Sequence, residues 1–164
     1  MLHLIIGKGK GKTSAAAGMA LRAAGHGKRV IFAQFMKDGS SGEIAVLNSV
    51  GCIEVMLPAE HYGFFSKMTE EQKAAAAGGY ADMLDRLISS EAFLIVLDEA
   101  LHALNKGLIK KEQLLKLLEK DCEIVLTGYD PPEYLTERAD YISEICKRRH
   151  PFDRGITARE GVEY

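Results

Sequence analysis

One short stretch near the amino terminus limits what this chain can fold into more than any other. An apolar run at residues 2–6 leads into Gly7-Lys8-Gly9-Lys10-Gly11-Lys12-Thr13-Ser14, and an alanine-rich segment follows directly. An apolar strand, a glycine-rich turn and a helix start, in this order, are typical of a loop that binds phosphate. The helix start attracts anions because it leaves backbone N–H groups unpaired and carries the positive end of the helix dipole. The sequence therefore predicts a phosphate-binding loop at residues 7–14.

The residue types of this loop predict separate roles. Glycines let the backbone approach phosphate closely, Lys12 would place its ammonium among the phosphate oxygens, and the Thr13 hydroxyl would ligate Mg²⁺. The usual pattern G-x-x-x-x-G-K-[ST] requires glycine where this chain has Ile6. We therefore expect the phosphates to sit differently from those in an ordinary ATPase. A lysine-rich surface turn without a ligand is disfavoured, because strand, loop, lysine, threonine and helix all occur in order.

The composition is that of an ordinary globular protein, with 47% hydrophobic and 27% charged residues. A length of 164 residues predicts a single domain spanning residues 1–164. The net charge of -2 gives no strong overall field that would favour nucleic acid. We find neither a run of about 18 apolar residues nor a signal-peptide pattern. A cytoplasmic location, with no membrane or nucleic-acid partner, is the resulting expectation.

The cysteines and histidines do not suggest metal chemistry. Cys52, Cys122 and Cys146 form no CxxC pair, and each lies in or beside an apolar segment, so we expect reduced, buried thiols. The five histidines show no HxxxH or HExxH spacing, which disfavours a transition-metal site.

Apolar runs of strand length alternate with helical segments along the whole chain. Strands are expected at residues 2–6, 28–35, 52–57, 93–97 and 123–128, with an edge strand at 141–146. Helices are expected at residues 13–25 and 43–50, from 69, from 100, at 110–120 and at about 131–138. Buried strands separated by helices predict an α/β fold with a mostly parallel sheet flanked by helices, of the P-loop nucleoside triphosphate hydrolase type.

For two of the expected helices, the sequence also predicts which residues are buried. In the helix at residues 13–25, Met19 and Leu21 are expected to face the sheet. The helix from residue 69 starts with a capping box and carries an apolar stripe that includes Tyr80 and Leu84. Gly78-Gly79 interrupts this helix, and each glycine costs about 1 kcal/mol relative to alanine. The pair therefore predicts a bend or a close helix contact.

Asp98 and Glu99 stand at the end of a buried strand. An adjacent pair of carboxylates often forms a turn or a helix cap. Together with the loop at residue 7, however, the pair favours a metal site in which Asp98 holds Mg²⁺ directly or through water. Residues 58–67 contain three aromatic side chains, which either pack over the core or line an apolar ligand. Both alternatives stay open.

From the residues alone, the predicted function is binding of ATP or GTP with Mg²⁺. The sequence offers no Ser-His-Asp or Cys-His arrangement, so any nucleophile is expected to come from the second substrate. A kinase of a small metabolite and a nucleotide-dependent switch without turnover are the competing hypotheses. A kinase would need a general base and arginines on a closing lid, and no arginine-rich segment indicates such a lid.

Several stretches together carry a more specific signal. They include the G-x-G-K-G-K-T-[ST]-A-A loop, Arg22-Ala-Ala-Gly-His-Gly-Lys, Gln34-Phe-Met-Lys, Val96-Leu-Asp-Glu, and the ending His150-Pro-Phe-Asp-Arg-Gly-Ile through Gly161-Val-Glu-Tyr. In these stretches the chain resembles the P-loop corrinoid (cobalamin) adenosyltransferases, over essentially its whole length. The terminal block is the most specific part, because generic P-loop proteins do not share it.

The resemblance implies transfer of the 5′-deoxyadenosyl group of ATP to the cobalt of a reduced corrinoid, cob(I)alamin or a precursor, with release of triphosphate. It implies that residues 7–13 hold the triphosphate and that Lys12 neutralises the charge of the leaving group. Thr13, Asp98 and Glu99 would place Mg²⁺. Arg22 and His150 match positions of nucleotide contacts.

The resemblance also implies an aromatic side chain that keeps the lower ligand off the cobalt. Gly63-Phe64-Phe65-Ser66 stands where family members carry Gly-Phe-x-Trp, and this chain has no tryptophan. Phe64 is the direct match, with Tyr62 or Phe65 as alternatives. A homodimer and a flavoprotein electron donor are further partners that the resemblance suggests.

Overall fold

Six parallel strands form one sheet at the centre of the protein, in the order β3-β2-β4-β5-β1-β6. A computed structural model describes residues 1–163, so Tyr164, the last residue of the terminal stretch, lies outside the described part. The strands are β1 (Leu2–Ile6), β2 (Val30–Gln34), β3 (Ile53–Met56), β4 (Leu94–Asp98), β5 (Glu123–Thr127) and β6 (Tyr141–Glu144). The predicted α/β class and the edge position of the last strand are confirmed.

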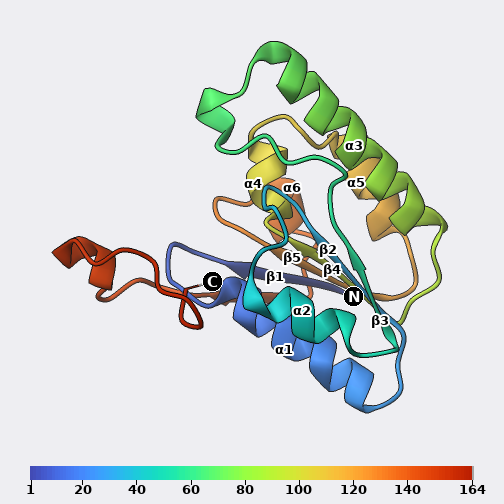
Figure 1. The fold of residues 1–164 in the computed structure, drawn as a ribbon. Helices are drawn as coiled ribbons and strands as arrows, with labels where there is room; N and C mark the ends of the chain where they lie inside the picture. Colours follow the sequence, from blue (N-terminus) through green and yellow to red (C-terminus); the bar gives the residue numbers. More distant parts are fainter. Residues whose placement is uncertain (164) are drawn as a thin grey trace.

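Helices cover both faces of this sheet (Figure 1). On one face lie α1 (Lys12–Gly25) and α2 (Gly42–Asn48). On the other lie α3 (Glu70–Ser89), α4 (Ala100–Asn105), α5 (Lys111–Leu118) and α6 (Glu133–Thr136). The helix α6 is shorter than the predicted 131–138: it starts later, because the extended Pro132 is its N-cap, and it ends at Thr136.

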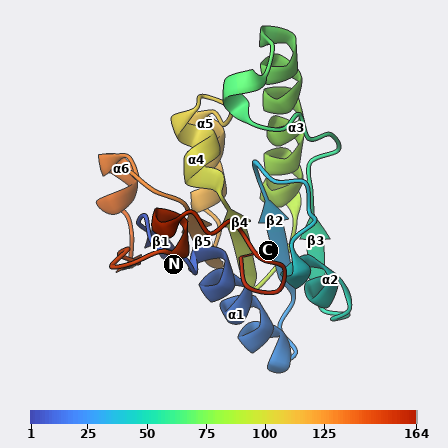
Figure 2. The same cartoon turned by 60° about the vertical axis from the view of Figure 1, so that its left-hand side comes forward.

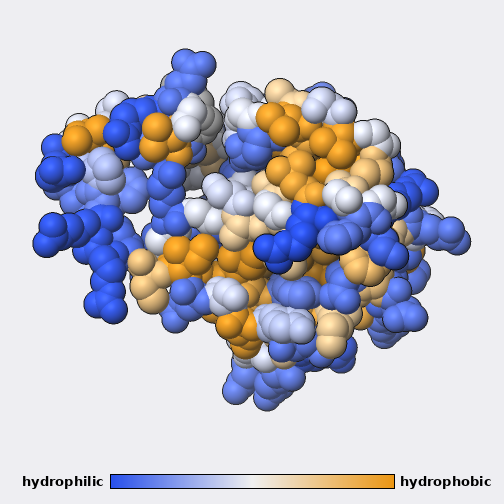
Figure 3. Space-filling model, turned by 90° about the horizontal axis from the view of Figure 1, so that it is seen from below, coloured by the Kyte–Doolittle hydropathy of each residue, from blue (hydrophilic) through white to orange (hydrophobic). Residues whose placement is uncertain are grey.

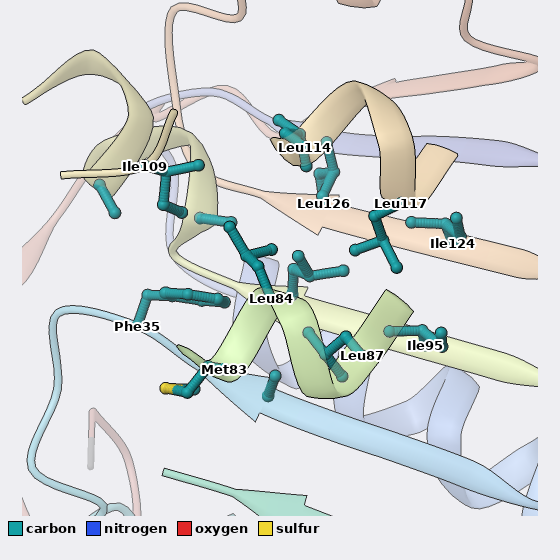
Figure 4. Packing of buried hydrophobic residues seen from close by; sticks show 14 of the residues in the cluster. Phe35, Met83, Leu84, Leu87, Ile95, Ile109, Leu114, Leu117, Ile124 and Leu126 are labelled. Carbon is teal, nitrogen blue, oxygen red and sulfur yellow. The ribbon is translucent and has the colours of Figure 1, made fainter. Parts of the chain in front are cut away.

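Two clusters of buried apolar side chains hold the layers together, one on each face of the sheet. The larger packs α3, α4 and α5 against the strands and includes Phe35, Leu84 and Leu117 (Figure 4). The smaller packs α1 and α2 against the opposite face and includes Phe32 and Leu47. Every interior strand contributes to both clusters. The sequences of these strands are therefore continuous apolar runs and do not alternate between apolar and polar residues.

The sheet-facing side of α1 consists of alanines, not of its larger apolar residues. Its buried positions are Ala16, Ala17, Ala20 and Ala23. Leu21 is 40% exposed, so the prediction that it faces the sheet is wrong, and Met19 packs only partly against the smaller cluster. The alanines recur at helical spacing, and a face of such small side chains lets the helix lie close to the strands.

The long helix α3 follows its predicted pattern. The capping box at Thr69 forms, and Tyr80, Met83, Leu84 and Leu87 are buried. The glycine pair at positions 78 and 79 lies inside this continuous helix, and a Cβ atom at either position would meet no atom within 4 Å. Among residues 1–163, the expected close helix contact is therefore absent at this glycine pair.

The cysteines differ from one another in exposure. Cys52 and Cys122 are half-buried, but Cys146 is exposed, so the prediction of a buried thiol is wrong for Cys146. It follows the edge strand β6, whose four residues are all exposed. Among the described residues, no cysteine is in a disulfide. Nor does any helix in this part of the chain have the length and apolar character needed to cross a membrane.

After β6 the chain forms an arm that leaves the sheet and returns, so that residues 161–163 lie beside the start of α1 (Figures 1 and 2). The arm contains one short 3₁₀ helix, η2 (Pro151–Arg154). Seen from the side of α1 and α2, the arm is largely hydrophilic, whereas apolar side chains gather over the body of the protein (Figure 3). Leu21 of α1 and Val46 of α2 are among the exposed apolar residues.

Candidate functional site

The glycine loop lies between β1 and α1 and is held from the side by the end of the last strand. The N–H of Gly9 donates to the carbonyl oxygen of Ile145 at 2.7 Å. A Cβ atom on Gly9 would come within 2.6 Å of that oxygen, so only glycine fits without a backbone shift. Gly11 is the N-cap of α1 and has φ 114°, in the left-handed region that favours glycine. The predicted strand, loop and helix start therefore form as a unit.

A polar cleft of about 530 Å³ opens over this loop. Of the eight predicted loop residues, Gly9, Lys10, Gly11, Lys12, Thr13 and Ser14 line it, together with Lys37, Ser41, Gly42, Glu43 and Glu99. The returning arm closes one side with Gly161, Val162 and Glu163. Gly7 and Lys8 instead line a neighbouring hollow of about 470 Å³ with Tyr129 and Cys146.

Charges of both signs line the cleft. The Lys12 ammonium donates to the carbonyl oxygen of Gly9 at 3.0 Å and so folds back onto the loop. Glu163 accepts hydrogen bonds from the guanidinium and the backbone N–H of Arg159, and these bonds lower the pKa of its carboxyl.

Asp98, at the carboxyl end of β4, is fully buried and accepts four hydrogen bonds. Its Oδ2 accepts from Thr13 Oγ1 at 3.3 Å, Gln34 Nε2 at 3.0 Å and Lys37 Nζ at 2.9 Å. Its Oδ1 accepts from Thr127 Oγ1 at 2.7 Å. The predicted meeting of Thr13 and Asp98 therefore occurs, inside a network that draws on three neighbouring strands and the loop.

Sequence reasoning missed three members of this network as site residues: Gln34, Lys37 and Thr127. Gln34 and Thr127 are the last residues of the buried strands β2 and β5, and each is fully buried. A polar residue that ends an apolar strand was the signal available, because carboxyl ends of parallel strands are where ligands bind. Gln34 also pairs in register with Asp98, which sequence alone does not reveal.

Glu99 lies where the polar cleft meets a second hollow. Its backbone has φ 59°, in the left-handed region, and its N–H donates to Thr127 Oγ1 at 2.8 Å. Its carboxylate lies 3.7 Å from Nδ1 of His102. In the described part of the chain, Glu99 and Lys37 are the two residues that line both cavities.

The second hollow, of about 410 Å³, is lined by residues of three segments: Met36 and Lys37; Gly63, Phe64, Phe65 and Ser66; and Glu99, His102 and Lys106. Phe64 is 77% exposed, whereas Phe65 packs partly against the larger core cluster, and the ammonium groups of Lys73 and Lys106 lie over its ring. Tyr62 does not line this hollow, and its hydroxyl donates to Glu60. The aromatic segment thus packs in part on the core, through Phe65, and it also lines a hollow; that this hollow receives an apolar ligand stays a prediction.

Two predicted contact residues lie elsewhere. Arg22 lines a separate apolar hollow with His3, Phe93 and other residues, about two turns of α1 beyond the end of the loop. His150 is the N-cap of η2, where its Nδ1 accepts from the N–H of Phe152 at 3.1 Å. Neither is among the described residues that line the polar cleft.

In the described part of the chain, no three histidine, cysteine, aspartate or glutamate side chains gather into a cluster that could hold a metal ion. A cation at Asp98 would therefore take its protein ligands from one carboxylate and the Thr13 hydroxyl. Such a small set suits Mg²⁺, which prefers hard oxygen ligands and keeps several of its waters or takes substrate phosphates. The Gln34 Oε1 atom, buried beside Asp98, has no hydrogen-bond partner among the described residues.

Comparison with known proteins relates this arrangement to one family. The model of the ATP:corrinoid adenosyltransferase family BtuR/CobO/CobP matches residues 1–164. The chain is 31% identical to the corrinoid adenosyltransferase of Escherichia coli (strain K12), over 100% of this chain and 85% of the relative. It is 35% identical to that of Pseudomonas aeruginosa, over 96% and 80% of the two chains, and 30% identical to that of Salmonella typhimurium, over 100% and 85%. The chain therefore belongs to the ATP:corrinoid adenosyltransferase family.

Proposed function

We propose that this protein transfers the 5′-deoxyadenosyl group of ATP to the cobalt of a reduced corrinoid and releases triphosphate. The observation that carries the proposal is the junction of two cavities of different character. A polar cleft over a phosphate-binding loop meets a hollow lined by Phe64 and Phe65, and Lys37 and Glu99 form the shared wall. One molecule with a polyphosphate and one with a large apolar face would meet at that wall.

The polar cleft is suited to the triphosphate. The start of α1 presents free N–H groups, and Lys10, Lys12 and Lys37 line the same space. In the proposed reaction the triphosphate is the leaving group, and its oxygen takes the electrons of the broken C5′–O bond. Positive charge around that oxygen stabilises the charge that develops in the transition state.

Thr13 and Asp98 are the residues that would hold Mg²⁺; Thr13 and Glu99 line the polar cleft, and Asp98 is buried and accepts a hydrogen bond from Thr13. Such an ion would add positive charge next to the phosphate oxygens. The chain's own contribution is to fix the two oxygen ligands. Asp98 is immobilised by Gln34 and Thr127, and Thr13 stands in the first turn of α1.

The aromatic hollow is suited to the corrinoid. We propose that cobalt of the reduced corrinoid supplies the electron pair that forms the new bond to C5′, so the protein needs no nucleophile of its own. Its task is to hold the two substrates in line for the displacement. Phe64 is the side chain best placed to replace the lower cobalt ligand, because it is exposed toward the hollow rather than packed into the core.

The test is an incubation with ATP, Mg²⁺ and chemically reduced cobalamin. The expected result is the absorption spectrum of the adenosylated corrinoid together with one equivalent of triphosphate. ADP formed in the presence of a small-metabolite acceptor, with an unchanged corrinoid spectrum, would support a kinase instead. Intact ATP would support a switch protein.

Two variants in the same assay test the roles of Phe64 and Phe65 in the aromatic hollow. Phe64→Ala should slow adenosylation when cob(II)alamin and a reductant are supplied, but should leave the free energy of unfolding within about 0.5 kcal/mol of the wild type, because Phe64 is exposed. Phe65→Ala, which removes a side chain that packs on the core, should lower stability more. If Phe64→Ala is as active as the wild type from cob(II)alamin, another group displaces the lower ligand.

We further propose a homodimer, a flavoprotein electron donor and a cytoplasmic location. Half-exposed Tyr141 and Ile142 on the edge strand β6 support contact with another chain. The absence of disulfides in residues 1–163 suits a reducing compartment. Sedimentation equilibrium would test the dimer.

A further inference from the structure

The ammonium of Lys37 lies at the position that a metal ion would need. It donates to Thr13 Oγ1 at 3.0 Å and to Asp98 Oδ2 at 2.9 Å, and so bridges the two oxygens assigned above to Mg²⁺. Mg²⁺ binds oxygen at about 2.0–2.1 Å, so an ion bound to both oxygens would fill the space between them. The ammonium and the ion therefore compete for one site.

Lys37 also provides the only positive charge that the structure pairs with Asp98 among residues 1–163. Asp98 is fully buried, and its other partners, Thr13, Gln34 and Thr127, are neutral donors. A buried carboxylate without a counter-charge is strongly unfavourable. When the site holds no metal ion, Lys37 supplies that counter-charge from within the chain.

The backbone places Lys37 so that it can exchange partners. It follows Met36, whose φ is 57° and whose N–H donates to the buried Tyr80 hydroxyl at 2.9 Å. The backbone is thus anchored next to the site, while the long side chain keeps 28% of its surface exposed. Because Lys37 lines both cavities, an ammonium that leaves Asp98 stays within the cleft that receives the phosphates.

We propose that Lys37 is a stand-in cation that occupies the metal site in the empty protein and yields it when nucleotide arrives. The proposal rests on the metal site assigned under the proposed function. A metal ion alone would have to displace the ammonium and leave it without a partner. A bound nucleotide offers its phosphate oxygens as new partners to the displaced ammonium. Metal ion and nucleotide therefore bind together, and the empty protein binds divalent metal poorly.

The test measures Mn²⁺ binding to the nucleotide-free protein, with free Mn²⁺ followed by electron paramagnetic resonance. Lys37→Met should bind Mn²⁺ more tightly than the wild type, on the order of tenfold, because the competing charge is gone. Lys37→Gln, which keeps a neutral donor next to Asp98, should show the same gain, and Lys37→Arg should behave like the wild type. Lys10→Met is the matched control, since Lys10 lines the same cleft without contacting Asp98.

Thermal unfolding gives a second readout that needs no nucleotide or corrinoid. In EDTA, Lys37→Met and Lys37→Gln should have lower melting temperatures than the wild type. Adding Mg²⁺ should raise the melting temperature of these variants by more than it raises that of the wild type. Unchanged Mn²⁺ affinity in both variants would overturn the proposal, as would an equal gain in Lys10→Met.

Failure of this proposal is distinguishable from failure of the proposed function. A wild type that adenosylates corrinoid while Lys37→Met gains no Mn²⁺ affinity refutes the role of Lys37 alone. A gain in Mn²⁺ affinity in a protein that forms no adenosylated product refutes the function and supports the stand-in cation.

Discussion

At the scale of single residues, the site depends on a few positions where no other residue type fits. Gly9 is the clearest, because the backbone of Ile145 leaves no room for a Cβ atom. Replacing its hydrogen by a methyl group would push the loop away from the strand end that holds it, and would break the 2.7 Å hydrogen bond from its N–H.

We therefore expect Gly9→Ala to weaken ATP binding at least tenfold, the equivalent of about 1.4 kcal/mol, as measured by isothermal titration calorimetry. The matched control is Gly18→Ala. Gly18 is exposed in α1, where a Cβ atom would meet nothing within 4 Å, so alanine should raise helix stability and leave ATP binding unchanged. Equal ATP affinity in Gly9→Ala and the wild type would show that the loop tolerates displacement.

Residue types alone predicted the loop, Thr13 and Asp98, because those signals are local in the sequence. They did not identify Lys37 or Gln34, whose roles arise only when β2 pairs with β4 and places their side chains on Asp98. The structure leaves Arg22 and His150 outside the lining of the polar cleft, although both match a motif. A motif match identifies the residue type at a position, but it does not predict how far that side chain lies from the cleft.

At the scale of whole elements, the glycine pair in α3 is the main departure from good helix sequence. Gly78 and Gly79 lie in the interior of a 20-residue helix with open space around both Cβ positions. Neither position has a positive φ, so alanine would adopt the same backbone without strain.

Gly78→Ala and Gly79→Ala should each stabilise the protein by about 0.5–1 kcal/mol, measured by urea denaturation. Ala76→Gly in the same helix is the converse control. It should destabilise, since Ala76 is buried and glycine costs helix stability. If either alanine variant destabilises the protein, α3 meets a partner or bends in a way that requires glycine.

The helices also show where pattern reasoning reaches its limit. The apolar stripe of α3 was predicted correctly, because its large apolar side chains Tyr80, Met83, Leu84 and Leu87 are the buried ones. In α1 the same reasoning selected Leu21, whereas the buried face belongs to alanines. Hydrophobicity favours the larger side chain, but the residues of α1 that face the sheet are small, and how closely a helix packs on a sheet cannot be predicted from the hydrophobicity of its residues.

At the scale of the whole molecule, one sheet joins two apolar clusters. Phe32 is fully buried in the smaller cluster and Leu84 in the larger, and β1, β2, β4 and β5 contribute to both. We propose on this basis that residues 1–164 unfold as one cooperative unit.

Phe32→Ala should cost about 3–5 kcal/mol and Leu84→Ala about 2–5 kcal/mol, because each leaves a cavity in a packed core. Both variants should still unfold in a single transition, with circular dichroism and tyrosine fluorescence giving the same midpoint. Leu21→Ala, at a partly exposed position, serves as the control and should change stability by about 0.5 kcal/mol or less. Two separated transitions in either core variant would show that the faces of the sheet unfold independently.

The strand order has a consequence for how the protein is made. The loop begins at the end of β1, but β1 pairs with β5 and β6, and the hydrogen bond acceptor for Gly9 is Ile145. During synthesis, the segment that carries the phosphate-binding residues leaves the ribosome more than a hundred residues before Ile145. We therefore expect the loop to gain its final structure only when the last strand has emerged, and nucleotide to assist none of the earlier stages of folding.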